Sequence, residues 1–315
     1  MSRRNQALAL LCRGSVTTNS AKSMKTAHRT LLTPKDLADA IGVSESALRR
    51  WVDGGRIRMS RTAGGHRRIP LQEAIRFIRQ TGATIVRPEL LGLDEFPAEA
   101  EGSTGSPRDE ALFNALRAGN GAVARGLMMS SYLGGLGLAA LFDGPVRSAM
   151  DRVGQIWQHD PRGIMIEHRA TAICIESIVE LRGLLPAVDD HAPLAIGGAA
   201  QDDPYQLPSM MAAATLAEAG FREVNFGANT PVELLAQEAT ERKARLVWLS
   251  ISSEQDQKRL RAAIRKLADG LAKRGIDLVL GGRFSSACVP RSMSNVTLSA
   301  SMSDLAATAR GMLTS

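Results

Sequence analysis

The sequence predicts a multidomain protein with a small winged helical domain, a four-helix bundle and an α/β domain built on a parallel sheet. Three observations predict this fold class. Short helical segments with glycine-marked turns occupy residues 31–82, and apolar residues recur at helical spacing over 108–186. Over 192–314 short apolar runs alternate with helical stretches, which is typical of a parallel sheet covered by helices on both faces.

The composition excludes several protein classes. Hydrophobic residues make up 44% of the 315 residues, too many for a disordered chain. No apolar run approaches the roughly 20 residues that a membrane-spanning helix needs, so we expect no membrane partner. The three cysteines, Cys12, Cys174 and Cys288, are too few and too scattered for a disulfide framework or a cysteine metal site. We therefore expect a cytoplasmic protein.

The net charge of +7 conceals a division of the chain into two parts. Residues 1–87 hold 17 Lys and Arg against 5 Asp and Glu, a net charge of +12. Residues 88–315 hold 22 against 27, a net charge of −5. A basic head on a mildly acidic body indicates a polyanion-binding module joined to another module.

Two segments around the first domain are expected to lack a core of their own. Residues 1–30 are basic, contain no acidic residue and are rich in Ser, Thr and Ala, which is typical of a flexible arm with weak phosphate affinity. An organelle transit peptide and a start codon assigned too far upstream are the alternatives. Residues 83–107 contain three prolines and several glycines, and we expect a linker there.

Residues 31–82 begin with two helix-start signals. Thr33 precedes Pro34 as a hydroxyl N-cap followed by proline at the first helical position, and Ser44 caps a second helix after the turn at Gly42. This spacing predicts a helix-turn-helix, in which the second helix enters the DNA major groove. Trp51 is expected to belong to the core of this domain.

An arginine-rich hairpin follows the second helix. Short extended runs surround Gly64-Gly65 and predict a wing, and Pro70 then opens a third helix. On this geometry the residues expected to contact DNA are Ser46, Arg49, Arg50, Arg56, Arg58, Arg61, His66, Arg67 and Arg68.

The segment from about 31 to 80 resembles the winged helix-turn-helix of the MerR family. The resemblance is carried by the run A-x-x-x-G-V-S-x-x-x-L-R-R-W at 38–51 and by R-T-x-G-G-H-R-R at 61–68. It implies operator DNA as the partner, bound by a dimer through the second helix and the wing. It also implies a location at the bacterial nucleoid.

Residues 108–186 lack strand alternation and predict four helices, at roughly 108–118, 122–132, 138–157 and 164–185. Gly144-Pro145 is expected to kink or restart the third helix. Trp157 ends its apolar stripe, and Glu167-His168 begins the fourth helix. The pattern V-G-x-x-W…E-H resembles the helical cap over cobalamin in light-responsive MerR-type regulators. It implies that Trp157 covers the corrin, that Glu167 and His168 flank the same face, and that His168 reaches the cobalt. From these residues alone, the alternative is a core tryptophan beside a satisfied Glu-His pair.

Residues 192–314 contain short apolar runs that predict strands near 193–198, 223–227, 246–251, 278–281 and 295–298. Helical stretches are expected at about 206–219, 231–243, 254–274 and 302–313. Ligands of such sheets lie beyond the carboxyl ends of the strands. This domain, 192–314, resembles the flavodoxin-like cobalamin-binding fold. The resemblance implies cofactor-binding roles for loop residues Asn229, Thr230, Ser250, Ser252, Gly281 and Gly282.

The first loop of this domain departs from the family pattern. The family places a histidine there that binds cobalt, an acid that orients it and a glycine that lets the nucleotide tail pass. In this chain Tyr205 stands at the histidine position, Pro208 at the glycine position, and Asp203 keeps an acid. A neutral phenol is a poor donor to cobalt because its pKa is near 10. Cobalamin held weakly or through its own base, a haem, another ligand and no ligand all remain open.

The domain order favours a transcriptional regulator, expected to be a repressor, whose rear module senses cobalamin, light or a related ligand and controls self-association. A ligand-free rear module that serves dimerisation or protein contacts is the alternative. A cobalamin shuttle subunit of a methyltransferase is a third hypothesis, but it needs no helix-turn-helix and depends on the missing histidine. The sequence shows no Ser-His-Asp set, paired carboxylates or phosphate loop, so we expect no catalytic site.

Overall fold

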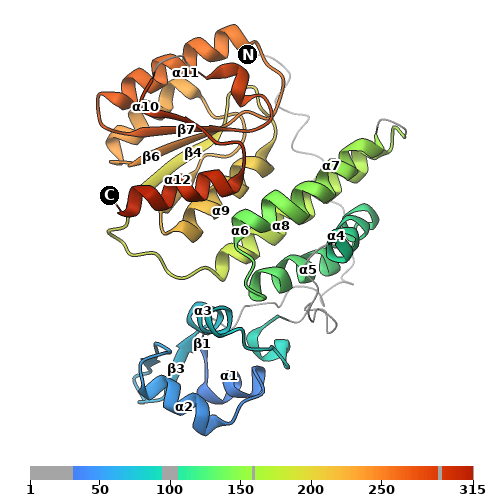
Figure 1. Ribbon diagram of the computed structural model, residues 1–315, viewed down its shortest axis with the longest axis vertical. Coiled ribbons are helices and arrows are strands. Elements are labelled where there is room, and N and C mark those ends of the chain that lie inside the picture. Colours follow the sequence, from blue (N-terminus) through green and yellow to red (C-terminus); the bar gives the residue numbers. More distant parts are fainter. Residues whose placement is uncertain (1–30, 94–105, 158–159, 290–292, 315) are drawn as a thin grey trace, which may run out of the picture.

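The computed structural model describes residues 31–93, 106–157, 160–289 and 293–314. The expected arm, 1–30, lies outside the described residues, as do residues 94–105 of the expected linker. Figure 1 shows the parts along the longest axis of the molecule, with the head at the bottom, the helical bundle in the middle and the α/β domain at the top. We refer to residues 31–93 as the head and to the described residues from 106 onward as the body.

The head contains the helix-turn-helix and the wing that the sequence predicts. The Thr33 hydroxyl accepts a hydrogen bond from the Asp36 backbone N–H, and the Asp36 carboxylate accepts one from the Thr33 N–H. Ser44 caps the second helix by accepting from the Ala47 N–H. Gly42 makes the intervening turn with a positive φ of 67°. The elements are β1 (Leu31–Leu32), α1 (Pro34–Ala40), α2 (Glu45–Asp53), β2 (Ser60–Arg61), β3 (Arg67–Pro70) and α3 (Leu71–Thr81).

The wing is an antiparallel pair in which Ser60 of β2 lies opposite Arg68 of β3. β1 pairs with the other edge of β3, so the short sheet has the order β1-β3-β2. The beginning of the expected linker also packs on the head. The backbone N–H groups of Val86 and Arg87 both donate to the Ala40 carbonyl, and Leu91 in the short helix η1 (Pro88–Leu91) is fully buried.

The bundle follows the predicted helices closely, with one irregularity. Gly144-Pro145 lie in a π-helical turn, η2 (Phe142–Val146), so the expected kink takes the form of a local widening of the helix. Trp157 ends the apolar stripe but is 51% exposed, whereas Val153 one turn earlier is fully buried. The helices are α4 (Ser106–Ala118), α5 (Gly121–Leu133), α6 (Leu138–Leu141), α7 (Arg147–Ile156) and α8 (Gly163–Gly183).

The last domain is an α/β domain with a five-stranded parallel sheet in the order β5-β4-β6-β7-β8. The order reverses between β4 and β6, where ligands of such folds bind at the carboxyl edge. Helices α9 and α12 pack together, as do α10 and α11, and Figure 1 shows the two pairs covering opposite faces of the sheet. The elements are β4 (Leu194–Ala199), α9 (Gln206–Ala219), β5 (Arg222–Asn225), α10 (Val232–Glu241), β6 (Leu246–Ser250), α11 (Gln257–Ala272), β7 (Asp277–Gly281), β8 (Val296–Leu298) and α12 (Met302–Thr314).

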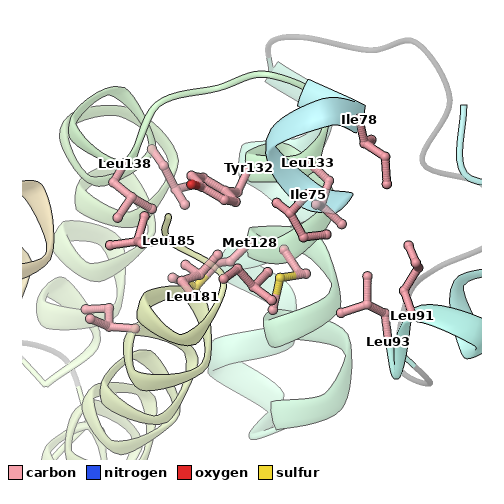
Figure 2. Packing of buried hydrophobic residues seen from close by; sticks show 14 of the residues in the cluster. Ile75, Ile78, Leu91, Leu93, Met128, Tyr132, Leu133, Leu138, Leu181 and Leu185 are labelled. Atoms are coloured by element: carbon pink, nitrogen blue, oxygen red, sulfur yellow. The ribbon is translucent and has the colours of Figure 1, made fainter. Parts of the chain in front are cut away.

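One hydrophobic core continues from the head into the body. Figure 2 shows Ile75 and Ile78 of α3 beside Leu133 of α5, with Leu181 and Leu185 further into the bundle. The same cluster of buried side chains reaches α9 through Leu207, Met210 and Ala214. Because burial of apolar area is the main favourable contribution to packing, the head is docked on the bundle by its third helix.

Candidate functional site

Helix α2 and the wing both present exposed basic side chains, which together we call the basic face. The Arg67 guanidinium of β3 lies 3.3 Å from the Asp53 carboxylate at the end of α2, which fixes the wing beside the helix. Ser46, Arg49 and Arg50 are exposed on α2, and Arg61 and His66 are exposed on the wing. The structure therefore places Arg67 of the wing beside α2. Arg56 and Arg58 are exposed in the segment between α2 and the wing, and the partly buried Arg68 guanidinium donates to the Arg67 carbonyl.

The arginines of this face differ in their present partners. Arg49 pairs with Glu45 one turn earlier at 3.0 Å, which offsets part of its charge. By contrast, the guanidinium groups of Arg50 and Arg61 have no partner among the described residues. Unpaired exposed guanidinium groups are the ones most available to phosphates or to guanine edges.

Arg56 has a structural role that its sequence position does not reveal. Its guanidinium carbon lies 5.9 Å from the centroid of the Trp51 ring and 5.8 Å from that of Phe77. The two rings themselves are 5.1 Å apart and tilted by 43°. Trp51 therefore belongs to the core of the head, as predicted, and Arg56 covers that aromatic pair by a cation–π contact.

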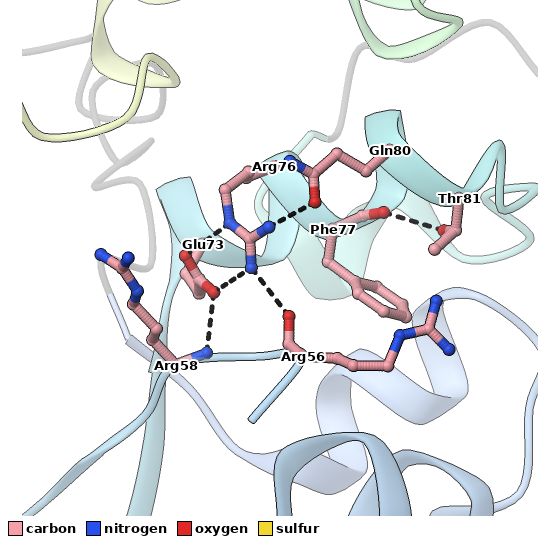
Figure 3. Close-up of polar contacts among 7 residues, drawn as sticks. All are labelled: Arg56, Arg58, Glu73, Arg76, Phe77, Gln80 and Thr81. Atoms are coloured by element: carbon pink, nitrogen blue, oxygen red, sulfur yellow. Dashed lines mark hydrogen bonds and ion pairs between the residues drawn. The ribbon is translucent and has the colours of Figure 1, made fainter. Parts of the chain in front are cut away.

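The segment that joins α2 to the wing is held by two residues of α3 that the sequence analysis did not single out. Figure 3 shows that the Glu73 carboxylate accepts from the Arg58 backbone N–H at 2.7 Å, while Arg76 donates to the Arg56 carbonyl at 2.8 Å. Arg76 also bonds the Glu73 carboxylate directly. Partial burial opposes ionisation of Glu73, but the Arg76 and Arg58 hydrogen bonds outweigh it and lower the pKa of that carboxyl. The i, i+3 spacing of these residues was the available signal.

A second candidate site lies at the carboxyl edge of the parallel sheet, where the predicted loop residues meet. Asp203 is fully buried, and its carboxylate accepts from the backbone N–H groups of Tyr205, Ser252 and Ser253. The shortest of these bonds, to Ser252, is 2.5 Å. Asp203 therefore fastens the loop after β4 to the loop after β6.

The remaining loop residues are also bonded to one another. Asn229, at a positive φ of 55°, accepts from the Asp202 N–H through its side chain. The Thr230 hydroxyl donates to the Gly227 carbonyl, and the hydroxyls of Ser250 and Ser252 lie 3.3 Å apart. Gly282 follows β7 with φ of 100°, where a Cβ would lie 2.4 Å from the Ile251 carbonyl oxygen. Close packing of loops thus explains Gly282, whereas a Cβ at Gly281 would meet only the Ser299 carbonyl oxygen, at an ordinary 3.6 Å.

These residues do not fit a corrinoid bound through a protein side chain. Tyr205, at the position of the family's histidine, is the N-cap residue of α9 and its side chain is 48% exposed. An imidazole bound to a metal needs a hydrogen-bonding partner that orients it, but the Asp203 carboxylate already accepts three backbone donors. The edge therefore lacks the imidazole ligand, and three of the positions at which the Asp203 carboxylate accepts hydrogen bonds are taken by the backbone.

The predicted cap residues lie on the bundle, at the α7–α8 end. Trp157 is half exposed, His168 is exposed, and Gly163 packs so closely on Trp157 that a Cβ there would lie 2.4 Å from its backbone nitrogen. Within the described residues, no hydrogen bond links Trp157, Glu167 or His168 to the loops at the carboxyl edge. One ion pair, Arg283 with Asp151 at 3.8 Å, joins α7 to the loop after β7. Among the described residues there is also no group of His, Cys, Asp and Glu suited to a metal ion.

A junction that the sequence analysis missed joins the head to both parts of the body. Arg79 of α3 donates to the carbonyls of Tyr132 and Leu136, at 2.6 and 3.2 Å, and lies over the Tyr132 ring at 3.6 Å. The same guanidinium pairs with Glu218 of α9 at 3.4 Å, and Glu218 also accepts from the Leu138 N–H at 2.7 Å. One side chain thus connects α3, α5 and α9.

Comparison with protein families supports the assignment of the head. Residues 31–82 match the model of a helix-turn-helix domain, the segment in which the sequence predicts one. No curated protein sequence matches the chain. None of the described helices is long and apolar enough to cross a membrane.

Solved structures show partial likeness to this chain. A monomethylamine corrinoid protein from Methanosarcina barkeri is 20% identical, covers 64% of this chain and 96% of its own, and superposes with a TM-score of 0.47. The methanol:cobalamin methyltransferase complex MtaBC from the same organism is 16% identical, with 75% and 88% covered and a TM-score of 0.34. A cobalamin-binding protein from Desulfitobacterium hafniense is 15% identical, with 64% and 97% covered and a TM-score of 0.33. All three TM-scores are below 0.5, so the likeness is weak.

Proposed function

We propose that this chain is a DNA-binding transcriptional regulator of the MerR type, without catalytic activity, that acts in the cytoplasm on operator DNA. The observation that carries the proposal is the exposed basic face of α2 and the wing, within the segment that matches a helix-turn-helix domain. The head, which docks on a larger body through α3, is the part that reads DNA. We further propose repression as the outcome, through an operator that overlaps a promoter so that the bound protein keeps polymerase from it.

The test is selection of a duplex from a random library with the full chain, followed by binding measurements over a range of salt concentrations. We expect a defined site and a steep salt dependence, with a slope of about 0.9 for each phosphate that the protein neutralises. Arg61→Ala should lower the slope by about one phosphate, since a wing arginine without a partner is the best placed to contact the backbone. Arg242→Ala, an exposed arginine of the body, serves as the control. Failure to enrich any duplex, or equal effects of the two substitutions, would contradict the proposal.

We propose that the body serves self-association, which sets how two heads meet two half-sites of an operator. This proposal takes the body to be ligand-free, and the loop residues at the carboxyl edge, whose polar groups are engaged with one another, favour that part of it. Sedimentation of the full chain with and without the selected duplex measures it. A monomer that binds a single half-site with full affinity would contradict it.

Sensing of a corrinoid or of light by the body is the second candidate, and the half-exposed Trp157 at the α7–α8 end of the bundle favours it. An indole left half exposed at the end of two helices is available to cover a flat ligand. The absorbance spectrum of the purified protein, before and after illumination, distinguishes the candidates. Sensing would be supported by a corrin spectrum that changes on illumination, accompanied by a change in the sedimentation of the protein. A colourless protein that takes up no corrinoid would support the ligand-free body.

A further inference from the structure

The space between α9 and the parallel sheet is occupied by the side chain of Trp248. This residue lies in the middle of β6, is 2% exposed, and packs in the cluster that includes Leu216 of α9 and Leu305 of α12. Gly197 lies directly beside it on β4. A Cβ at Gly197 would come within 2.4 Å of the Trp248 ring, so the glycine leaves room for the indole.

Hydrogen bonds close the helix onto the sheet around this indole. The Trp248 Nε1–H donates to the Ser209 hydroxyl at 3.2 Å, and that hydroxyl donates to the Asn225 side-chain oxygen at 2.9 Å. The same oxygen accepts from the Gly227 backbone N–H at 2.9 Å. Ser209 is fully buried in the first turn of α9. The chain of bonds therefore runs from β6 through α9 to the end of β5, and each polar atom in it has a partner.

A corrinoid held by a side chain at position 205 would need this same space. Such binding displaces the corrinoid's own lower base, and the base with its nucleotide tail must then enter the protein below the ring. Residue 205 caps α9 at the carboxyl edge, so the path inward runs between α9 and strands β4 and β6. The displaced base is built on fused six- and five-membered rings, like the indole that is already there, and needs at least as much space.

We propose that Trp248 and Ser209 form a plug that excludes a tail-inserted corrinoid from this domain, whichever residue stands at 205. Tyr205 at the family's histidine position and Pro208 at its glycine position are then obstacles in addition to the plug. Tyr205→His alone therefore does not restore a corrinoid site. The inference stands apart from the proposed DNA-binding function, because it concerns the interior of the α/β domain alone.

The test is titration of the full-length chain with hydroxocobalamin, followed by the absorbance change that accompanies loss of the corrinoid's own lower base. The wild type and Tyr205→His should give no such change. Tyr205→His/Trp248→Ala should give it, and should bind at least about tenfold more tightly than Tyr205→His. Tyr205→His/Trp248→Phe is the matched control, because it keeps a large ring in the space and should remain closed.

Two results would overturn the proposal. The first is displacement of the lower base by Tyr205→His alone, which shows that the space admits the tail with Trp248 in place. The second is the absence of any gain in Tyr205→His/Trp248→Ala when circular dichroism shows that the variant is folded, which places the obstruction elsewhere. If that variant does not fold, the wild type and Tyr205→His titrations still decide, because base displacement in either contradicts the plug.

Discussion

Replacement of Arg79 tests how firmly the head is attached to the body. Arg79→Met keeps most of the side-chain stem over Tyr132 but removes the charged donor. It deprives the Tyr132 and Leu136 carbonyls of their guanidinium partner and leaves Glu218 with the Leu138 N–H. The Arg79 and Glu218 side chains are only 19% and 23% exposed, so water replaces the lost bonds incompletely.

The expected magnitude follows from these contacts. A hydrogen bond from a charged donor contributes about 1.5–3 kcal/mol, and breaking a buried ion pair costs about 3–5 kcal/mol. Burial raises the pKa of the Glu218 carboxyl, although the Leu138 hydrogen bond and the nearby Arg79 charge lower it. The 3.4 Å pair with Arg79 therefore does not offset the cost of burying the ionised carboxylate. Glu218 can therefore take up a proton when Arg79 is lost, which limits the penalty. We expect a loss of about 2–4 kcal/mol at the junction.

Native-state hydrogen exchange measures this loss locally. Amides of α3 should lose about 2–4 kcal/mol of protection, while those of α11, on the far face of the sheet, should be unchanged. Arg87→Met is the control, because Arg87 makes an exposed pair with Glu89 and should cost no more than about 0.5 kcal/mol. An Arg79→Met effect no larger than that of Arg87→Met, or an equal loss in α11, would refute the reasoning.

Three further predictions concern the basic face of α2 and the wing, the contact between Asp143 and α12, and Glu218 at the junction of head and body. Arg50→Ala should weaken binding to the selected duplex by about 1–3 kcal/mol at fixed salt, measured by fluorescence anisotropy; a larger effect of Arg56→Ala, whose side chain covers the aromatic pair, would contradict the assignment of Arg50. Asp143→Ala should destabilise the start of α12 by about 1–2 kcal/mol, because the Asp143 carboxylate accepts from the N–H groups of Met302 and Ser303 and from the Ser303 hydroxyl. Hydrogen exchange in α12 measures the loss, and protection equal to that of the wild type would disprove this role of Asp143. Glu218→Gln tests the raised pKa of Glu218. Above pH 4.5 the folded protein keeps the Glu218 proton where the unfolded chain has lost it. The stability that this proton contributes is therefore fully present below the ordinary pKa of 4.5 and declines as pH rises through the folded-state pKa. Urea unfolding should therefore show wild-type stability falling relative to Glu218→Gln as pH rises from 4.5, and parallel pH profiles would exclude it.

The order and type of the elements could be predicted from the sequence because their signals are local. Thr33-Pro34 and Ser44 mark helix starts through bonds to residues three positions away, and the structure confirms both caps. The alternation that predicts a parallel sheet also reflects short-range patterning. The expected restart at Gly144-Pro145 was located correctly, but its π-helical form depends on how the neighbouring helices pack.

The contacts that join the parts of the molecule could not be predicted because they link residues distant in the sequence. Arg79 and Glu218 are 139 positions apart, and Trp248 meets Ser209 across 39 positions. Asp203 illustrates the same limit. Its sequence position predicted an acid that orients a metal-bound side chain, but the folded chain commits it to backbone donors of two loops. Residue type indicated a ligand role, and only the three-dimensional arrangement showed that the carboxylate is already engaged.

The attachment of the head determines how such a protein can be regulated. Because the core is continuous from α3 into the bundle and Arg79 ties α3 to α9, each head keeps the orientation that its body gives it. Under the proposed self-association, two heads on one duplex must match half-sites about 34–36 Å apart, or a multiple of this distance, and the contact between two bodies would set that match. Association of the bodies would raise the effective concentration of the second head, which strengthens binding without any change in the basic face of α2 and the wing. On this proposal, control of DNA affinity through the body needs no movement within one chain and no ligand between α9 and the sheet.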